Sequence, residues 1–217
     1  MAWTAPSTFV AGAILTAAQL NTNVRDNTLA GGPIYATEAL RDAAITSPFE
    51  GQRAYITAST VAAATGLVTA VPTGIQTIYN GAAWVCVTPV SADTYTSGTT
   101  TNATLPYTVT LASGGTNPSV TVTTGTTALI TFGAWAQSST AGASACVSVA
   151  VSGATTLAAS DSWNIFIYNS TAQISLSRTF PLTGLTAGTN TFTLQYRMGA
   201  AGTGTIGQRV ITVQGIA

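Results

Sequence analysis

The chain contains no histidine and no lysine, and its only charged residues are six arginines and six acidic residues. Without histidine, neither a Ser-His-Asp or Cys-His arrangement nor a histidine-containing zinc site is possible. Without lysine, there is no P-loop and no amine for a Schiff base. We therefore expect a protein that is not an enzyme and that binds neither a cofactor nor a metal.

The low charge also disfavours whole classes of partner. Recognition of nucleic-acid phosphates needs a basic stripe, and binding to a membrane surface needs a polybasic segment, which scattered arginines do not provide. A membrane-spanning helix needs about 20 consecutive apolar residues, whereas the apolar stretches here are short. No charged and apolar leader of the secretory kind opens the sequence. We expect no nucleic-acid partner and no membrane insertion.

Self-association is favoured by the same composition. Hydrophobic residues make up 46% of the 217 residues, charged residues make up 6%, and the net charge is zero. Near-neutral proteins with few charges tend to associate. Cys86 and Cys146 lie far apart in strand-like runs and are interpreted as buried small hydrophobic residues; their spacing alone does not establish a disulfide.

Residues 1–34 are predicted to be a non-globular lead with one helix. Thr16 is a good N-cap, and Gln19 completes a capping box. An isolated helix of about 12 residues is marginal in water, so it must dock, either onto its own chain or onto a larger particle. We favour the particle. The candidate anchoring residues are Trp3, Phe9, Leu20 and Val24.

Residues 35–90 are predicted to form a small hairpin module. A helix signal begins at Thr37 and ends before Ser47-Pro48, and a short strand follows at 53–57. Asn80-Gly81 lies between two β-rich runs, a sequence typical of a type I′ hairpin turn in which both central residues have positive φ.

Residues 91–217 are predicted to be all β. The expected strands are joined by turns rich in Gly, Asn and Thr, and the run 192–198 alternates cleanly, with Phe192, Leu194, Tyr196 and Met198 on a core face. This pattern is typical of an antiparallel sandwich or jelly roll. The strands are expected at 107–111, 120–123, 129–135, 147–152, 163–168, 174–176, 192–198 and 209–216.

The outward positions of these strands are mostly Thr, Ser, Gln and Ala. A lone monomer would then have weakly protected strand edges, and the pattern fits better if copies of the chain cover one another.

Carboxylate pairs and stacking aromatics are the remaining chemistry. Paired carboxylates support glycoside cleavage, but Asp161 in Ala-Ser-Asp-Ser-Trp is typical of a turn or cap. Tryptophans stack on sugars, yet three of the four lie in strand-like segments where core packing is the ordinary role. The acidic candidates are Asp26, Glu38, Asp42, Glu50, Asp93 and Asp161, and the tryptophans are Trp3, Trp84, Trp135 and Trp163.

Three stretches resemble structural proteins of tailed bacteriophages. Residues 3–12 (WTAPSTFVAG) with 15–27 (LTAAQLNTNVRDN) are similar to the opening of minor tail and fibre-like proteins, apart from Ala13, where an acidic residue often stands. Residues 39–51 through 78–85 (IYNGAAWV) resemble a small hairpin module of phage tail and fibre proteins. Residues 182–188 (LTGLTAG) before 192–196 are similar to distal jelly-roll heads, which usually form trimers.

The resemblance implies a non-enzymatic phage virion protein in three parts: an anchor (1–34), a hairpin module (35–90) and a jelly roll (91–217) for trimerisation and binding. It implies a trimeric fibre, spike or decoration on the tail or capsid, assembled in the host bacterial cytoplasm and facing the host. The implied partners are two further copies, other virion proteins and host surface glycans. A lectin-like glycan-binding module and a carboxylate-dependent polysaccharide depolymerase remain as alternatives.

Overall fold

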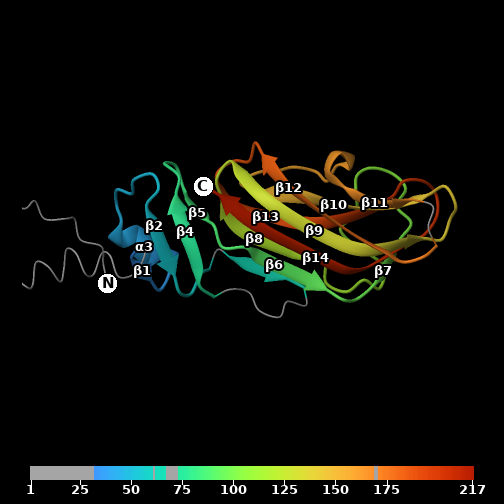
Figure 1. Ribbon diagram of the computed structural model, residues 1–217, viewed down its shortest axis with the longest axis horizontal. Coiled ribbons are helices and arrows are strands. Elements are labelled where there is room, and N and C mark those ends of the chain that lie inside the picture. The colour runs from blue at the N-terminus through green and yellow to red at the C-terminus, as the bar shows by residue number, and fades with distance from the viewer. Residues whose placement is uncertain (1–31, 61, 67–72, 169–170) are drawn as a thin grey trace, which may run out of the picture.

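The computed structural model describes residues 32–60, 62–66, 73–168 and 171–217. The predicted helix after Thr16 and the candidate anchoring residues Trp3, Phe9, Leu20 and Val24 lie outside these residues. The described chain is mainly β, as predicted, with a small sheet and its helix at one end and a larger sandwich beyond it (Figure 1).

The small sheet and its helix form the hairpin module. Helix α3 begins where the sequence predicts, because the Thr37 side chain caps it and accepts a hydrogen bond from the Leu40 amide at 3.3 Å. The sheet has the strand order β1-β2-β4-β5, in which only β1 and β2 run parallel. The bounds are β1 (Ile34–Tyr35), α3 (Glu38–Ala44), β2 (Arg53–Ile56), β4 (Ile75–Tyr79) and β5 (Trp84–Cys86).

The β4–β5 hairpin forms as predicted, but its turn type was predicted wrongly. Among the described residues, Ser113 and Gln208 are the only non-glycines with positive φ, so Asn80 does not adopt it, whereas Gly81 has a φ of 87°. The Asn80 amide donates to the Ala83 carbonyl at 3.1 Å, which makes Gly81 and Ala82 the central residues. Positive φ at the first central residue is the type II′ pattern. The Asn80 side chain instead accepts from the Ala83 amide at 2.9 Å.

Gly81→Val is expected to destabilise the protein by about 1–3 kcal/mol, because a β-branched residue is strained at positive φ. Space is not the obstacle, since a Cβ at Gly81 would meet nothing closer than Glu50 Oε2 at 3.8 Å. Urea unfolding measures the cost, and Ala82→Val, at the neighbouring position without positive φ, is the control. Equal losses in the two variants would contradict this turn assignment.

The larger part is an antiparallel β sandwich of the jelly-roll type. One layer, the β13 sheet, has the order β11-β10-β13-β8-β3; the other, the β9 sheet, has the order β12-β9-β14-β6, with β7 also paired to β14. The bounds are β3 (Ala63–Thr65), β6 (Val90–Thr94), β7 (Gly98–Thr100), β8 (Ser119–Thr124), β9 (Thr127–Ser138), β10 (Ser144–Gly153), β11 (Ile165–Tyr168), β12 (Ile174–Thr183), β13 (Gly188–Met198) and β14 (Gly204–Ile216). A short 3₁₀ turn, η2 (Asp161–Trp163), precedes β11.

Period-two alternation builds the sandwich core. The predicted core face of β13 is confirmed, since Phe192, Leu194, Tyr196 and Met198 are all fully buried. Buried side chains of β9 face them from the other layer, and buried side chains of β10 lie beside them in the same sheet. The core continues into the hairpin module without a break, because Ile56 and Ile75 belong to the same cluster.

Residues 107–111 were wrongly predicted to be a strand. This segment makes one backbone bridge, in which Thr108 and Tyr196 exchange hydrogen bonds of 2.9 and 2.8 Å. The physical reason is that residues 107–111 and β8 compete for the same edge of β13, and β8 already pairs with that edge up to Thr193. Conversely, β3 lies within the 35–90 region yet joins the sandwich by pairing with β8. The boundaries 1–34, 35–90 and 91–217 stay a prediction.

Both cysteines are buried with free thiols, which confirms their interpretation as small hydrophobic residues. Burial raises the pKa of Cys86 to about 11 and also raises that of Cys146. Both sulfurs are therefore neutral thiols at physiological pH.

Candidate functional site at the junction of module and sandwich

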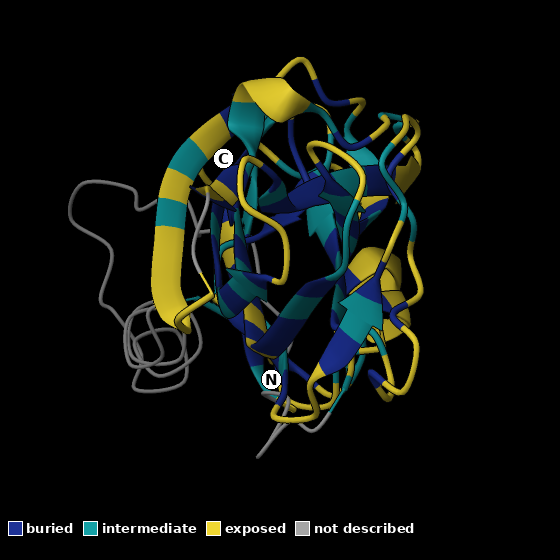
Figure 2. Cartoon of the chain, turned by 90° about the vertical axis from the view of Figure 1, so that its right-hand side faces the viewer, coloured by how far each residue is buried: buried dark blue, intermediate teal, exposed yellow. Residues whose placement is uncertain are grey.

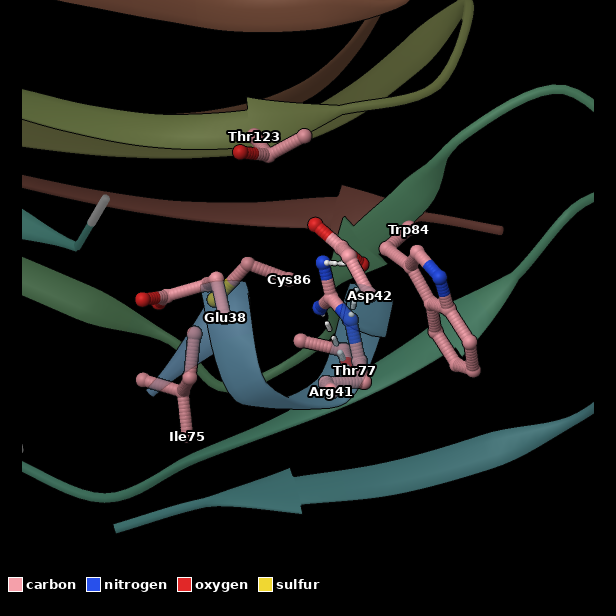
Figure 3. A pocket seen from close by; sticks show the side chains of 8 residues that line it. All are labelled: Glu38, Arg41, Asp42, Ile75, Thr77, Trp84, Cys86 and Thr123. Carbon is pink, nitrogen blue, oxygen red and sulfur yellow. Dashed lines mark hydrogen bonds and ion pairs between the residues drawn. The ribbon is translucent and has the colours of Figure 1, made fainter. Parts of the chain in front are cut away.

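A cavity of about 220 Å³ lies where the hairpin module meets the sandwich. Figure 3 shows α3 and the module strands on one side and Thr123 of β8 on the other. The cavity brings together two of the acidic candidates from the sequence, Glu38 and Asp42, one turn apart on α3. Its lining residues are Glu38, Arg41, Asp42, Ile75, Thr77, Trp84, Cys86 and Thr123.

Glu38 is buried and its carboxylate is held by three hydrogen bonds. Oε1 accepts from the Ser59 hydroxyl at 2.5 Å, and Oε2 accepts from the Thr60 amide and hydroxyl at 3.2 and 3.1 Å. Burial alone would raise the pKa of Glu38, but the hydrogen bonds from Ser59 and Thr60 outweigh it, and the pKa is lowered. Glu38 therefore carries its negative charge at neutral pH and ties α3 to the chain after β2.

Arg41 is buried between a carboxylate and an aromatic ring. Its Nε and Nη2 lie 2.9 and 2.8 Å from Asp42 Oδ1, and its Nη1 donates to the Thr77 hydroxyl at 3.4 Å. The guanidinium carbon lies 4.6 Å from the centroid of the Trp84 ring, a cation–π distance. The arginine thus fills one wall of the cavity and is itself neutralised.

Arg41 and Asp42 neutralise each other, and the charged Glu38 is held by neutral donors. Glycoside cleavage needs one carboxyl group whose raised pKa keeps it protonated as an acid, and the lowered pKa of Glu38 gives the opposite state. The Cys86 thiol is not a ready nucleophile at neutral pH. The arrangement suits a rigid junction between module and sandwich.

Asp161, predicted to have a turn or cap role, opens the 3₁₀ turn η2 and holds a second cluster on the outer face of the β13 sheet. Its carboxylate accepts from Arg197 Nη2 at 2.5 Å and Nε at 3.1 Å, and from the Tyr107 hydroxyl. The Arg197 guanidinium also lies over the Tyr107 ring at 5.3 Å. This cluster fastens residues 107–111 to the sandwich.

Asp161→Asn is expected to cost at most about 1 kcal/mol at neutral pH, because the ion pair is half exposed. Hydrogen bonds from Arg197 and then Tyr107 lower the pKa of Asp161. A lowered folded-state pKa means that this stabilisation is present above about pH 4, the ordinary value, and is lost as the pH falls through the folded value. Urea unfolding of both proteins should show the difference shrinking in acid; a difference independent of pH would contradict it.

The three tryptophans among the described residues have different surroundings. Trp84 is buried in the core, as expected for a residue in a strand-like segment. Trp135 instead lies on the outer face of the β9 sheet across from Gly207, where a Cβ would come within 2.6 Å of its ring. Trp163 belongs to η2 and donates from Nε1 to the Val149 carbonyl at 3.0 Å.

Sequence reasoning missed the buried Arg209. It is 1% exposed, and its guanidinium is held between the sheets by Tyr196, Asn117 and two backbone carbonyls. The sequence shows Arg209 followed by alternating apolar residues in 210–216. This pattern does not tell whether the arginine begins the strand and is exposed or lies inside the strand and is buried.

The described residues contain no cluster of three or more His, Cys, Asp or Glu side chains suited to a metal ion. Within the same residues, no helix has the length and apolar character to cross a membrane.

No known protein family matches the chain, and no curated protein matches its sequence. Among solved structures, it is similar to the globular domain of zebrafish complement 1qA (13% identity, TM-score 0.31, covering 56% of this chain and 95% of that one). It is also similar to Eiger TNF from S. frugiperda (12% identity, TM-score 0.34, covering 78% of this chain and 94% of that one). A third similar structure is the enzymatically active domain of tailspike protein 4 of bacteriophage CBA120 (13% identity, TM-score 0.23, covering 57% of this chain and 19% of that one). With TM-scores this low, no role of these proteins transfers to the chain.

Proposed function

We propose that the chain is a non-enzymatic structural and binding protein of a tailed phage particle, working as a homotrimeric fibre, spike or decoration on the tail or capsid. The observation that carries the proposal is the polar surface of the sandwich, which carries few charges. Neighbouring hydroxyls on both outer faces bond to one another across the strands, for example Thr131 with Thr179 at 2.9 Å and Thr121 with Thr191 at 2.8 Å.

Paired hydroxyls favour close contact with another protein surface. A hydroxyl that already has a partner keeps its hydrogen bond when water is removed, so its burial avoids the cost of an unsatisfied group. The charged side chains of the sandwich are largely engaged within it: Arg209 is buried, and Arg197 is paired with Asp161. Such a surface is suited to stable assembly.

The two ends of the described chain differ, which supports a directional role. β1 and α3 lie at one end of the long axis, and β7 lies at the other (Figure 1). Four of the charged residues, Glu38, Arg41, Asp42 and Arg53, belong to α3 or β2 at the first end. We assign the first end to the particle, through residues 1–34, and the β7 end to the host and its surface glycans.

Light scattering of the purified chain is expected to give three times 21.8 kDa. Deleting residues 1–30 should leave a folded trimer that no longer sediments with particles lacking this protein, while the full chain does. A monomer at micromolar concentration would contradict the trimer. Equal sedimentation of the truncated form would place the anchor elsewhere.

A further inference from the structure

One long side of the sandwich is bounded by two outermost strands. Among the residues that the structure describes, β12 pairs only with β9, and β11 pairs only with β10. Seven of the ten residues of β12 are exposed, which is unusual for a strand of this length. Figure 2 shows such a strand, coloured mainly as exposed, along the outside of the molecule. The backbone groups on the outer side of β12 are therefore available to another chain.

Apolar side chains lie on both strands of this side, which we call the β11–β12 edge. Phe166 and Tyr168 of β11 are 55% and 64% exposed, and Ile174 and Leu176 of β12 are 41% and 38% exposed. Single exposed apolar residues are normal on a protein surface, but a contiguous group marks an interaction site.

Phe166 and Tyr168 are exposed because they alternate with the buried residues of β11, whereas the exposure of Ile174 and Leu176 has its cause in the strand register. Ile174 and Leu176 stand opposite Ala136 and Ala134 of β9, which belong to the core, so both point between the sheets. The four-residue β11 is too short to cover the ten-residue β12. A narrow apolar crevice remains, lined by Ala134, Ala136, Ala145, Val147, Ile165, Phe166, Ile167 and Leu176.

Protection against edge contact is weak here. Natural edge strands are commonly guarded by charges, especially lysine, and by proline, and β12 carries one arginine and one proline, Arg178 and Pro181. Arg178 is already engaged, since its Nη1 donates to the Asn164 carbonyl at 3.1 Å and its guanidinium lies 5.3 Å from the Phe180 ring centroid.

We infer that the β11–β12 edge is the surface through which one copy of the chain packs against another; this rests on the proposed function. A closed ring of three copies joins unlike surfaces, so the edge of one copy packs on a different face of the next. Because the edge is almost uncharged, the two meet without like-charge repulsion, whereas a highly charged partner would find only Arg178 on it. The area is sufficient. Ten residues span about 33 Å, and a standard interface of about 800 Å² per partner needs a strip of that length about 25 Å wide. Where β11 lies beside β12, two sheets about 10 Å apart with their outer side chains provide this width, and beyond β11 the exposed side chains of β12 continue the strip.

The test uses the full chain with two sets of edge substitutions. Phe166→Ser with Tyr168→Ser removes exposed rings without touching the core, and Leu176→Arg places a charge at the crevice. Light scattering is expected to show the mass falling threefold, to that of one chain, in both, with an unchanged circular dichroism spectrum. Tyr95→Ser, at an even more exposed aromatic position away from this edge (69%), should keep the wild-type mass.

Hydrogen exchange of the wild-type chain supplies a second readout that does not depend on substitution. The amides of β12 should exchange more slowly in the assembled protein than after dilution to monomer, whereas those of the 139–143 loop should not change. If the wild type assembles but the Phe166/Tyr168 variant assembles equally well, the interface lies elsewhere and the proposed trimer survives. A wild-type chain that stays monomeric overturns the trimer and this interface together.

Discussion

Replacing Arg209 with methionine is expected to lower the free energy of unfolding by about 3–5 kcal/mol, because four buried or partly buried acceptors lose a charged donor. Its guanidinium donates to the Tyr196 hydroxyl at 3.0 Å, to Asn117 Oδ1 at 3.3 Å, to the Thr96 carbonyl at 3.2 Å and to the Gly114 carbonyl. Burying the charge costs several kcal/mol, but four hydrogen bonds to a charged donor, at about 1.5–3 kcal/mol each, exceed that cost. Methionine fills similar space and leaves these acceptors with fewer donors.

Urea unfolding measures the loss, with Arg178→Met as the matched control. Arg178 lies on the exposed edge strand β12 and donates to the Asn164 carbonyl, so its removal should cost less than about 1 kcal/mol. A midpoint for Arg209→Met equal to that of the wild type would show that desolvation cancels the hydrogen bonds, as in proteins where buried ionic groups add no net stability.

Gly215→Ala is expected to cost about 3 kcal/mol, although it adds one methyl group, because it overpacks the junction between module and sandwich. A Cβ on Gly215 of β14 would lie 2.5 Å from Val85 Cγ1 and 2.7 Å from the Cys86 carbonyl oxygen. The backbone of β5 cannot move away without disturbing its packing on β8 and β14. Thermal and urea unfolding should both show the loss.

A double substitution separates crowding from other effects of the methyl group. Val85→Ala removes the side chain that the new methyl would meet, so Val85→Ala with Gly215→Ala should cost less than the sum of the two single changes. Strict additivity would mean that the two positions are not in conflict and that β5 approaches β14 for another reason.

The long strands could be predicted because a two-layer sandwich imposes a strict alternation on them. Residues 192–198 alternate without exception, and the side chains predicted to face the core are fully buried. β12 was predicted too short, at 174–176 instead of Ile174–Thr183. Residues on both faces of β12 are exposed, so its sequence lacks the alternation of apolar and polar residues from which a strand is predicted.

Two of the short strands, β3 and β7, could not be predicted, since distant partners rather than their own residues make them strands. β3 reads Ala-Ala-Thr and is a strand because β8 lies beside it. β7 reads Gly-Thr-Thr and pairs with β14 near the other end of the sequence. Local propensity carries little information for such segments.

The candidate site was predictable in its residue types and not in its electrostatics. Glu38 and Asp42 were among the acidic candidates, and helical spacing brings them together on α3. That Glu38 would be held by Ser59 and Thr60 depends on the path of the chain after β2. The burial of Arg209 likewise needs Asn117 and Tyr196, which are distant in the sequence.

The insertion of β3 into the sandwich has a mechanical consequence. The chain leaves the hairpin module after β2, adds β3 to the β13 sheet, and returns to form β4 and β5 before it enters the sandwich again at β6. A pull on residue 32 against Ala217 therefore loads three crossings between the parts, together with the core that they share. Stretching a single molecule should unfold the module and the sandwich together in one rupture event, so that under load the described chain behaves as one mechanical unit.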